Sequence, residues 1–364
     1  LFPSPRKHDF CVHLTAFCFK IVLDFFSAGC SGVQALIQHD QVDALHKKGI
    51  RADLLNSELC KGCHAETLHS FAEKGGLLYL APEQLRREDV RTALIAARVR
   101  RVVVDEAHIL PQVNNGFRKA YAEIGPFIDS LPERPQIVAF TATATSSDFS
   151  YIARSLHMSN PKHKLFPVKR SNIQLYVKKS DVKGNSRLKS RKRNIRLAMV
   201  DDVLKKYRKK GATIVYCPTV GDVKRTTKWL HSRGYPAKAY HGKLSKKKRK
   251  LVHKYFLQKK RPIVFATNAF GLGIDRPDVR LVVHAGLPLG IDSYTQEIGR
   301  AGRDGKKARA VLIYTPSDAN QAKQILRKNS DPQAAARAAK CLDALQKAIR
   351  HPKDLWQRID RFFR

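Results

Sequence analysis

Acidic residues are scarce in this sequence. Its 364 residues include 31 Asp and Glu against 69 Lys and Arg, which gives a formal net charge of +38. Such an excess repels itself unless a polyanion neutralises it, so nucleic acid is the favoured partner over a passively soluble basic chain. Hydrophobic content of 43% and charged content of 27% indicate a globular protein rather than a disordered one. The length exceeds one ordinary core and predicts two domains.

A disulfide framework is also lacking. The seven cysteines are scattered along the chain, which favours a reducing, intracellular location. Cys60-Lys61-Gly62-Cys63-His64 matches the c-type haem attachment pattern, but no haem-protein context accompanies it and haem is disfavoured. No second Cys or His pair stands at ligand spacing, so we expect no zinc.

No apolar run is long enough to span a membrane, and no membrane partner is expected. Phe10–Gly29 is the most apolar stretch, but two charged residues interrupt it and Leu14–Phe19 is too short. The chain begins with Leu1 rather than Met, which favours a fragment or a processed product. Residues 1–30 stay unassigned, as a buried or ill-defined segment.

Short apolar runs rich in β-branched residues predict buried strands of parallel sheets. Helical stretches separate them, so the predicted fold class is α/β. The predicted strands cover residues 76–82, 99–104, 136–140, 213–217, 262–266, 280–284 and 310–314. A helix that ends at Gly49 is expected within residues 31–58.

Basic residues cluster in two places. Residues 178–193 hold eight Lys and Arg against the single acid Asp181, which indicates an exposed linker. Plain solvation and contact with a nucleic-acid backbone explain it equally well. Lys243–Lys250 holds six basic residues in eight and predicts a solvated helix face that could also steer DNA. After Pro316 the sequence is Ala-rich and helical in character, and Asp354–Arg364 is uninformative.

An acidic pair follows one predicted strand. Asp105-Glu106-Ala107-His108 comes directly after residues 99–104, at the strand end where open α/β sheets bind ligands. Asp105 could hold Mg²⁺ through water, and Glu106 could polarise the water that attacks a γ-phosphate. His108 could link the site to neighbouring loops. The alternative is an acidic helix cap.

Two more segments follow strands. Thr141–Thr145 offers short hydroxyls that can relay hydrogen bonds between the acidic pair and a neighbouring domain. Thr267–Asp275 is rich in glycine, which lets the backbone approach a ligand closely. Asp275 adds a carboxylate for a ribose or an arginine.

Gln296–Gly305 contains two arginines three residues apart. On a helix, Arg300 and Arg303 would share one face and could converge on one target. Their planar guanidinium groups suit phosphate oxygens, so the pair suggests a polyphosphate ligand. A solvated basic helix end is the alternative.

In this order the four segments resemble motifs II, III, V and VI of superfamily 2 helicases. The Gly-Arg-Ala-Gly-Arg-Asp-Gly run, together with Ala-Phe-Gly-Leu-Gly-Ile-Asp, resembles the RecQ family in particular. Shorter likenesses to motifs Ia, Ib and IV occur at Asp40–Val42, Leu78–Glu83, Tyr216–Thr219 and Tyr240–Gly242. The resemblance covers roughly residues 31–316.

The resemblance implies two RecA-like parallel-sheet domains and an ATP-dependent 3′–5′ DNA helicase. The implied substrates are single-stranded DNA and duplex junctions, unwound in recombination and repair, with ATP and Mg²⁺ as cofactors. The implied domains are residues 31–170 (partial first RecA-like domain), 171–194 (basic linker), 195–318 (second RecA-like domain) and 319–364 (helical basic tail).

By motif position the resemblance also implies functional residues. The catalytic set is Asp105, Glu106, Arg300 and Arg303, with Arg303 as an arginine finger. The set for ATP and Mg²⁺ is Asp105, Glu106, His108, Gly273, Asp275, Gln296, Arg300 and Arg303. The nucleic-acid set is Thr141, Thr143, Thr219, His241, Thr267, Phe117 and Arg118.

The sequence departs from the family in its phosphate loop. No Gly-x-x-x-x-Gly-Lys-Ser/Thr segment occurs, although its amides and Lys hold the β- and γ-phosphates. The first domain is therefore expected to lack its phosphate-loop portion, and ATP turnover of this chain to be impaired. A non-catalytic, nucleic-acid-binding remnant is the alternative. After the acidic box only Phe117 and Arg118 keep the family's aromatic-loop register, and no Cys-rich zinc subdomain or winged helix follows. An RNA helicase is disfavoured by the form of the last motif.

Overall fold

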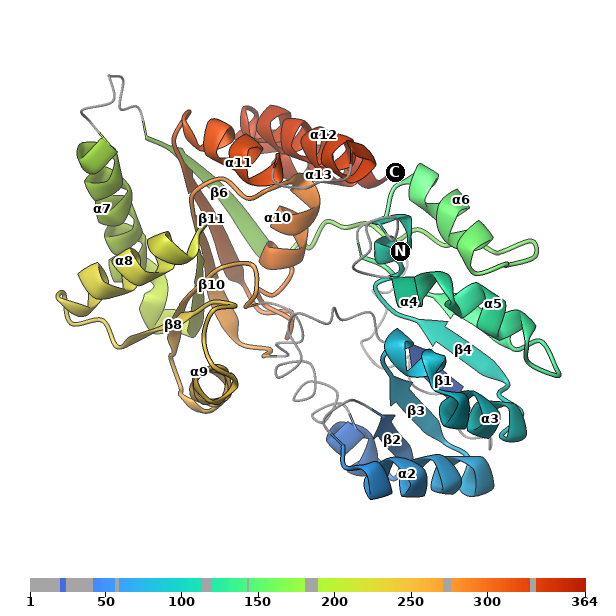
Figure 1. Ribbon diagram of the computed structural model, residues 1–364. Coiled ribbons are helices and arrows are strands. Elements are labelled where there is room, and N and C mark those ends of the chain that lie inside the picture. The colour runs from blue at the N-terminus through green and yellow to red at the C-terminus, as the bar shows by residue number, and fades with distance from the viewer. Residues whose placement is uncertain are drawn as a thin grey trace, which may run out of the picture. The chain divides into compact units, whose positions relative to one another are not determined.

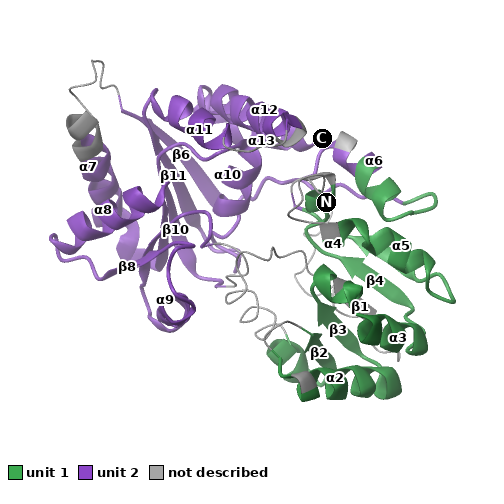
Figure 2. Cartoon of the chain, viewed as in Figure 1, with its two compact units in different colours: residues 1–25, 38–141, 151–161 green, residues 26–37, 142–150, 162–364 purple. Residues whose placement is uncertain are grey.

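The chain forms two compact units, each built on a parallel sheet. The computed structural model describes residues 20–23, 42–55, 59–112, 119–142, 144–180, 189–270, 276–327 and 332–364. Unit 1 contains residues 1–25, 38–141 and 151–161, and unit 2 contains residues 26–37, 142–150 and 162–364 (Figure 2). The expected α/β class is thus confirmed.

Unit 1 contains a five-stranded sheet in the order β2-β3-β1-β4-β5, with all neighbours parallel (Figure 1). The strands are β1 Lys20–Leu23, β2 Ala52–Leu55, β3 Leu77–Leu80, β4 Arg101–Val104 and β5 Gln136–Ala139. Parallel register brings the carboxyl ends of all five strands to one edge, where ligands bind in open α/β sheets.

Helices connect these strands. They are α2 Lys61–Lys74, α3 Glu88–Ala96, α4 Lys119–Ala122 and α5 Ile124–Asp129, with 3₁₀ turns η2 Pro82–Arg86 and η3 Ala107–Gln112. Helix α6 Ser146–Ser155 follows β5 and is divided between the two units. Helix α3 shows why they form locally. Glu88 and Asp89 in its first turn complement the helix dipole, and Val90 and Leu94, four residues apart, are fully buried.

Unit 2 contains a six-stranded sheet in the order β6-β11-β10-β7-β9-β8, also parallel throughout. Its strands are β6 Ile173–Lys179, β7 Ala212–Tyr216, β8 Ala237–Tyr240, β9 Ile263–Ala266, β10 Val279–Ala285 and β11 Ala308–Tyr314. Its helices are α7 Lys189–Tyr207, α8 Val220–His231, α9 Lys246–Gln258, α10 Ile291–Ile298, α11 Asp318–Leu326, α12 Pro332–Ile349 and α13 Leu355–Phe363, with 3₁₀ turns η5 Arg208–Lys210 and η6 Pro352–Asp354.

The central strands of this sheet are buried on both faces. Ile214 and Val282 pack in a cluster with α10, α12 and α13, whereas Val215 and Val283 pack in a second cluster with α7 and α8. Side chains of alternate residues thus pack into the cores on opposite faces of the sheet, which explains the near-continuous apolar runs in the sequence. All seven strands predicted from these runs are present.

One prediction about segments outside the motifs needs correction, and for two other segments the structure adds elements that the sequence did not identify. Residues 1–30 are not merely unassigned, because Lys20–Leu23 is the central strand of the first sheet. The linker predicted over residues 171–194 instead contains strand β6 and the start of α7. The uninformative tail is helix α13, whose Leu355, Ile359 and Phe363 are buried in the core of unit 2.

Three further expectations can be compared with the described residues. The chain is helical at 42–46 and reverses at Gly49, with φ of 70°, as the predicted stop requires. Residues 31–41 lie outside the described part. Of the helices that the structure describes, none is long and apolar enough to cross a membrane. The sequence predicts no disulfide framework for the cysteines, and among the described residues one pair, Cys60–Cys63, does form a disulfide.

Candidate functional site

The acidic box occupies a tight turn at the carboxyl end of β4. Val104 ends the strand, and the backbone pairs with the residues after β5 through Phe140 N–H to Val104 O (2.8 Å) and Ala107 N–H to Phe140 O (2.9 Å). The Glu106 N–H donates to Asp105 Oδ1 at 2.8 Å. These bonds hold the two carboxylates at the sheet edge rather than in a helix cap, because only the η3 turn follows them.

Glu106 has a left-handed backbone, with φ of 49°. A non-glycine residue pays roughly 1–2 kcal/mol for this conformation. Such a cost persists where the surroundings fix it, and it is concentrated at functional sites. The turn therefore uses strain to aim the carboxylate of Glu106.

The negative charges in this turn are also electrostatically unfavourable. Burial, with the nearby Glu106 carboxylate second, raises the pKa of Asp105 above its ordinary value, although the Glu106 N–H and His108 oppose the shift. The molecule thus keeps two close carboxylates at a partly buried edge. A divalent cation with oxygen ligands fits this donor set, since it would offset both the burial and the repulsion.

We expect Asp105→Asn to stabilise unit 1 at neutral pH. Because the pKa of Asp105 is raised in the folded state, its carboxyl group contributes to stability below the ordinary Asp pKa of about 4. This contribution is lost as the pH rises through the pKa of the folded state. The variant should melt roughly 2–4 °C higher at pH 7.5, the shift that about 1 kcal/mol produces in a unit of this size. The gain should disappear near pH 4.

Calorimetry at both pH values measures this prediction, with Asp89→Asn as the control. The Arg87 guanidinium lowers the pKa of Asp89, so that its charge is stabilising above pH 4. The control should therefore melt lower at pH 7.5. An Asp105→Asn variant that melts at or below the wild type at neutral pH would contradict the argument.

His108 connects the acidic box to the threonine-rich segment. Its Nδ1 lies 3.2 Å from Glu106 Oε2 and 3.2 Å from Thr141 Oγ1. Glu106 Oε2 lies near the ring without accepting a hydrogen bond from any described residue, whereas the contact with Thr141 is a hydrogen bond. This is the contact expected from a relay between motifs that follow neighbouring strands. Thr143, by contrast, lies outside the described residues.

In unit 2, three predicted nucleic-acid residues follow adjacent strands. Thr219, Thr267 and His241 come after β7, β9 and β8, so they meet at one carboxyl edge. The backbone ties them together through Cys217 N–H to Ala266 O (2.7 Å) and Thr267 N–H to Tyr240 O (3.2 Å).

The side chains of these residues are less available than their motif positions imply. The Thr219 hydroxyl caps α8, accepting from Asp222 N–H at 3.1 Å and donating to Asp222 Oδ2 at 2.6 Å. His241 is 3% exposed, and burial, followed by the charge of Lys224, lowers its pKa. Thr267 is 8% exposed. At this edge, these three side chains are therefore poorly placed to meet phosphate directly.

The arginine pair lies in a turn, which corrects the helical expectation. Helix α10 ends at Ile298, and the chain continues through turns with Arg300 N–H to Glu297 O at 3.4 Å and Ala301 N–H to Ile298 O at 3.0 Å. Both arginine charges nevertheless act on the buried phenol of Tyr216, whose pKa burial raises. Within the described residues, Arg300 Nε is buried and has no hydrogen-bond partner. The two cations therefore share one neighbourhood.

Residues that the sequence did not single out support this turn. Arg170 donates to Gly299 O at 2.8 Å and Gly302 O at 2.6 Å, and burial followed by the Arg303 charge lowers its pKa. Beneath the turn, His284 Nε2 and Glu297 Oε2 form a buried pair at 2.8 Å. No local pattern indicates these partners, because they lie 13 to 132 residues away from the atoms they bind.

We expect Gly302→Ala to cost about 1–3 kcal/mol of unfolding free energy. Gly302 has φ of 54°, and a Cβ there would lie 2.7 Å from Lys306 O and 2.6 Å from Asn172 Nδ2. Left-handed strain and a backbone clash therefore add. Gly234→Ala is the matched control, since φ is 78° but nothing lies within 4 Å of its Cβ. Urea unfolding should show the larger loss for Gly302→Ala, and equal losses would refute the clash.

Several predicted site residues lie outside the described part of the chain. They are Gly273, Asp275, Phe117, Arg118 and Thr143. Gln296 lies on α10, partly buried, in the same helix as Glu297. Among the described residues no group of three or more His, Cys, Asp or Glu side chains could hold a metal ion.

Comparison with known proteins agrees with this arrangement. The DEAD/DEAH box helicase model matches residues 34–150, and the helicase conserved C-terminal domain model matches residues 195–305. Among solved structures, MrfA bound to DNA has a TM-score of 0.63 at 15% identity, over 94% of this chain and 45% of that one. Dbp5 of S. cerevisiae, bound to RNA and ADP BeF3, has a TM-score of 0.60 at 17% identity, over 94% and 82%. Two RecA-like helicase folds are thus present.

Curated relatives identify the family to which the chain belongs among the helicases. The ATP-dependent DNA helicase RecQ of Bacillus subtilis is 32% identical over 87% of this chain and 53% of its own length. RecQ of Pasteurella multocida is 34% identical over 91% and 49%. The chain belongs to the RecQ family of superfamily 2 helicases. It spans about half the length of these relatives.

Proposed function

We propose that the chain is the motor core of an ATP-dependent 3′–5′ DNA helicase that unwinds duplex junctions in recombination and repair. The observation that carries this proposal is the acidic turn, where a strained Glu106 and a partly buried Asp105 end strand β4. The RecQ relatives are named ATP-dependent DNA helicases. An intracellular, DNA-bearing compartment, nucleoid or nucleus, would follow from that role.

The roles of individual residues follow from their chemistry. Asp105 would hold Mg²⁺ through water, and the cation would neutralise charge on the phosphates. Glu106 would orient and polarise the attacking water, with His108, itself bonded to Thr141, beside its carboxylate. Arg303 would act as the arginine finger and Arg300 would bind phosphate oxygens. Gly273, Asp275 and Gln296 would complete the nucleotide contacts.

DNA would be held mainly through its phosphates. Thr219, Thr267 and His241 follow β7, β9 and β8 at one edge of the sheet, where the N-terminus of helix α8 also lies, and helix N-termini favour anions. Thr143, Phe117 and Arg118 would extend these contacts on the first unit. This mode binds any sequence, as a translocating motor requires.

The second candidate is a nucleic-acid-binding remnant without turnover. It is favoured by the missing Gly-x-x-x-x-Gly-Lys-Ser/Thr segment. The edge of the first sheet is consistent with this gap. Among described residues β5 pairs only with β4, its Ile137 and Val138 are partly exposed, and Phe140 is 50% exposed. In a parallel sheet, a strand with apolar residues such as these is ordinarily covered by a neighbour. A strand that leads into a phosphate loop could occupy that position beside β5.

ATP hydrolysis stimulated by single-stranded DNA separates the two candidates. We expect little or no turnover from the 364 residues, and DNA-stimulated turnover once an upstream segment with a phosphate loop is joined to them. Glu106→Gln in the longer protein is the control, because it keeps the shape of the side chain but cannot accept a proton. A longer protein no faster than this control would rule out the motor.

A further inference from the structure

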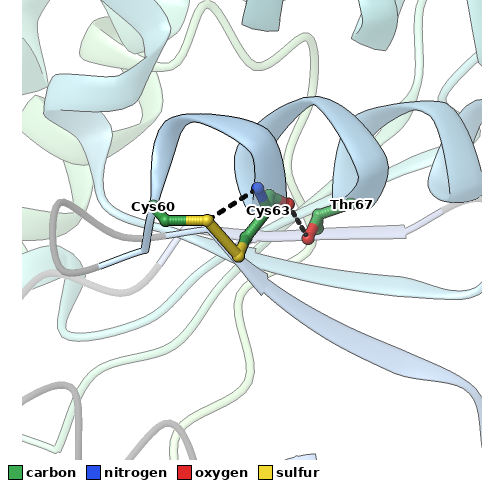
Figure 3. Close-up of a disulfide and its surroundings, with 3 residues drawn as sticks. All are labelled: Cys60, Cys63 and Thr67. Carbon is green, nitrogen blue, oxygen red and sulfur yellow. Dashed lines mark hydrogen bonds between the residues drawn. A yellow bond between two sulfur atoms is a disulfide. The ribbon is translucent and has the colours of Figure 1, made fainter.

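Two cysteines stand together at the start of α2, outside the acidic site. Cys60 and Cys63 are joined by a disulfide with a Cα–Cα distance of 5.1 Å, and Cys60 is the N-cap residue of the helix (Figure 3). The sheet order places β2, which precedes α2, three positions from β4. At the usual strand spacing this is ~14 Å, too far for the cysteines to join the acidic turn.

The helix end is built to stabilise a thiolate as well as a disulfide. Cys63 N–H donates to Cys60 Sγ at 3.0 Å, and Thr67 Oγ1 donates to Cys63 O at 2.8 Å, so the first turn is held whether or not the sulfurs are joined (Figure 3). The first turn contains no acidic residue. An N-terminal helix dipole without a competing anion favours the ionised form of a capping thiol.

Exposure assigns different roles to the two sulfurs. Cys60 is exposed and Cys63 is partly buried. An external reagent therefore reaches Cys60 first, while Cys63 is placed to attack the Cys60 sulfur from within the same turn. The spacing of 5.1 Å lies inside the range for a disulfide, so closure needs no backbone movement.

Other described cysteines offer a contrast. Cys217 and Cys341 are buried, and burial raises the pKa of each to about 12. Both remain thiols at neutral pH and are chemically inert by comparison. The structure thus separates one accessible pair from two packing cysteines.

We propose that Cys60 and Cys63 form a reversible thiol–disulfide exchange site for low-molecular-weight disulfides of the glutathione type. The Cys60 thiolate attacks one sulfur of the small disulfide, forms a mixed disulfide and releases one small thiolate. The Cys63 thiolate then attacks the Cys60 sulfur, closes the internal disulfide and releases the second. Two protein thiols are oxidised and one external disulfide is reduced to two thiols, and excess small thiol drives the reverse.

Oxidised glutathione is the probe for this site. The full chain is reduced, equilibrated at graded ratios of reduced to oxidised glutathione, quenched with N-ethylmaleimide and cleaved after glutamate, which releases Leu59–Glu66 with both cysteines. We expect the two alkylations in this peptide to disappear together as the buffer becomes oxidising and to return when reduced glutathione is restored. Cys217→Ser, the control, should leave this titration unchanged.

Single substitutions test the order of attack. Cys63→Ser should accumulate a lasting glutathione adduct on Cys60, whereas Cys60→Ser should form the adduct on Cys63 at least ~10-fold more slowly, as expected when the thiolate fraction falls tenfold. The proposal fails if both thiols stay alkylated in oxidised glutathione, if the disulfide does not reopen, or if the two single variants react at equal rates.

Discussion

Between 50 and 200 mM salt, the chain should lose about 300-fold in affinity for single-stranded DNA if it makes six phosphate contacts, and more with each further contact. The physical reason is counterion release, which dominates when a strongly cationic surface meets a polyanion. A net charge of +38 supplies that surface. Nucleic-acid binding by either candidate function requires this slope, whereas salt-insensitive binding would contradict both.

Helix α9 is the first place to look for these contacts. Its exposed Lys246, Lys247, Lys248 and Lys250 begin just after His241, at the carboxyl edge where Thr219 and Thr267 also lie. Ligands of open α/β sheets bind at this edge. Changing the four lysines to glutamine should therefore flatten the plot of log affinity against log salt, by ~0.7 for every DNA phosphate that the variant no longer neutralises.

A matched variant controls for net charge alone. Lys205, Lys206, Lys209 and Lys210 are also exposed, but they precede β7 and so lie at the opposite, amino edge. Changing these four to glutamine removes the same charge and should leave the slope nearly unchanged. Fluorescence anisotropy titrations at four salt concentrations measure both variants. Equal flattening by the two would show that binding depends on overall charge rather than on α9.

In the second sheet the sequence predicts the four strands that are buried on both faces and misses the two at the edges. Strands β7, β9, β10 and β11 are apolar runs because the side chains of each pack into the cores on both faces of the sheet. Strand β6, at the sheet edge, alternates buried and exposed residues and ends in two lysines, so its composition resembles a linker. Strands β2 and β8 are four residues long, with a charged residue in each. Edge position, which only tertiary pairing reveals, explains these misses.

The site shows the same division. Motif order identifies Asp105, Glu106 and His108 and their neighbour Thr141, since contacts between adjacent parallel strands follow from the chain order. The partners of the arginine turn cannot be read in this way. Arg170 reaches Gly302 from 132 residues away, and Thr219 proves to be a helix cap. Periodicity cannot anticipate that α10 stops at Ile298, because the carbonyl groups of the turn that follows, at Gly299 and Gly302, are bound by Arg170 from a distant part of the chain.

In a longer protein that includes a phosphate loop, Arg303→Ala should lower DNA-stimulated ATP turnover by at least ~10³, the range established for arginine fingers. An arginine finger stabilises charge that develops on the transferring phosphate, so for a residue in this proposed role the loss should appear in kcat. Affinity for a non-hydrolysable ATP analogue should change far less. Arg303 lies in a turn held by Arg170 and Asn172 through carbonyl groups, so its side chain can be removed without breaking those bonds.

Two variants sharpen this test. Arg303→Lys keeps a positive charge but loses the planar fork, and should recover little of the turnover if geometry as well as charge is required. Arg327→Ala removes an exposed arginine from the end of α11 and should leave turnover unchanged. Equal melting temperatures would exclude misfolding as the cause of any loss. Turnover by Arg303→Ala within threefold of the parent would mean that Arg300, which acts on the same buried Tyr216, is the transition-state cation instead.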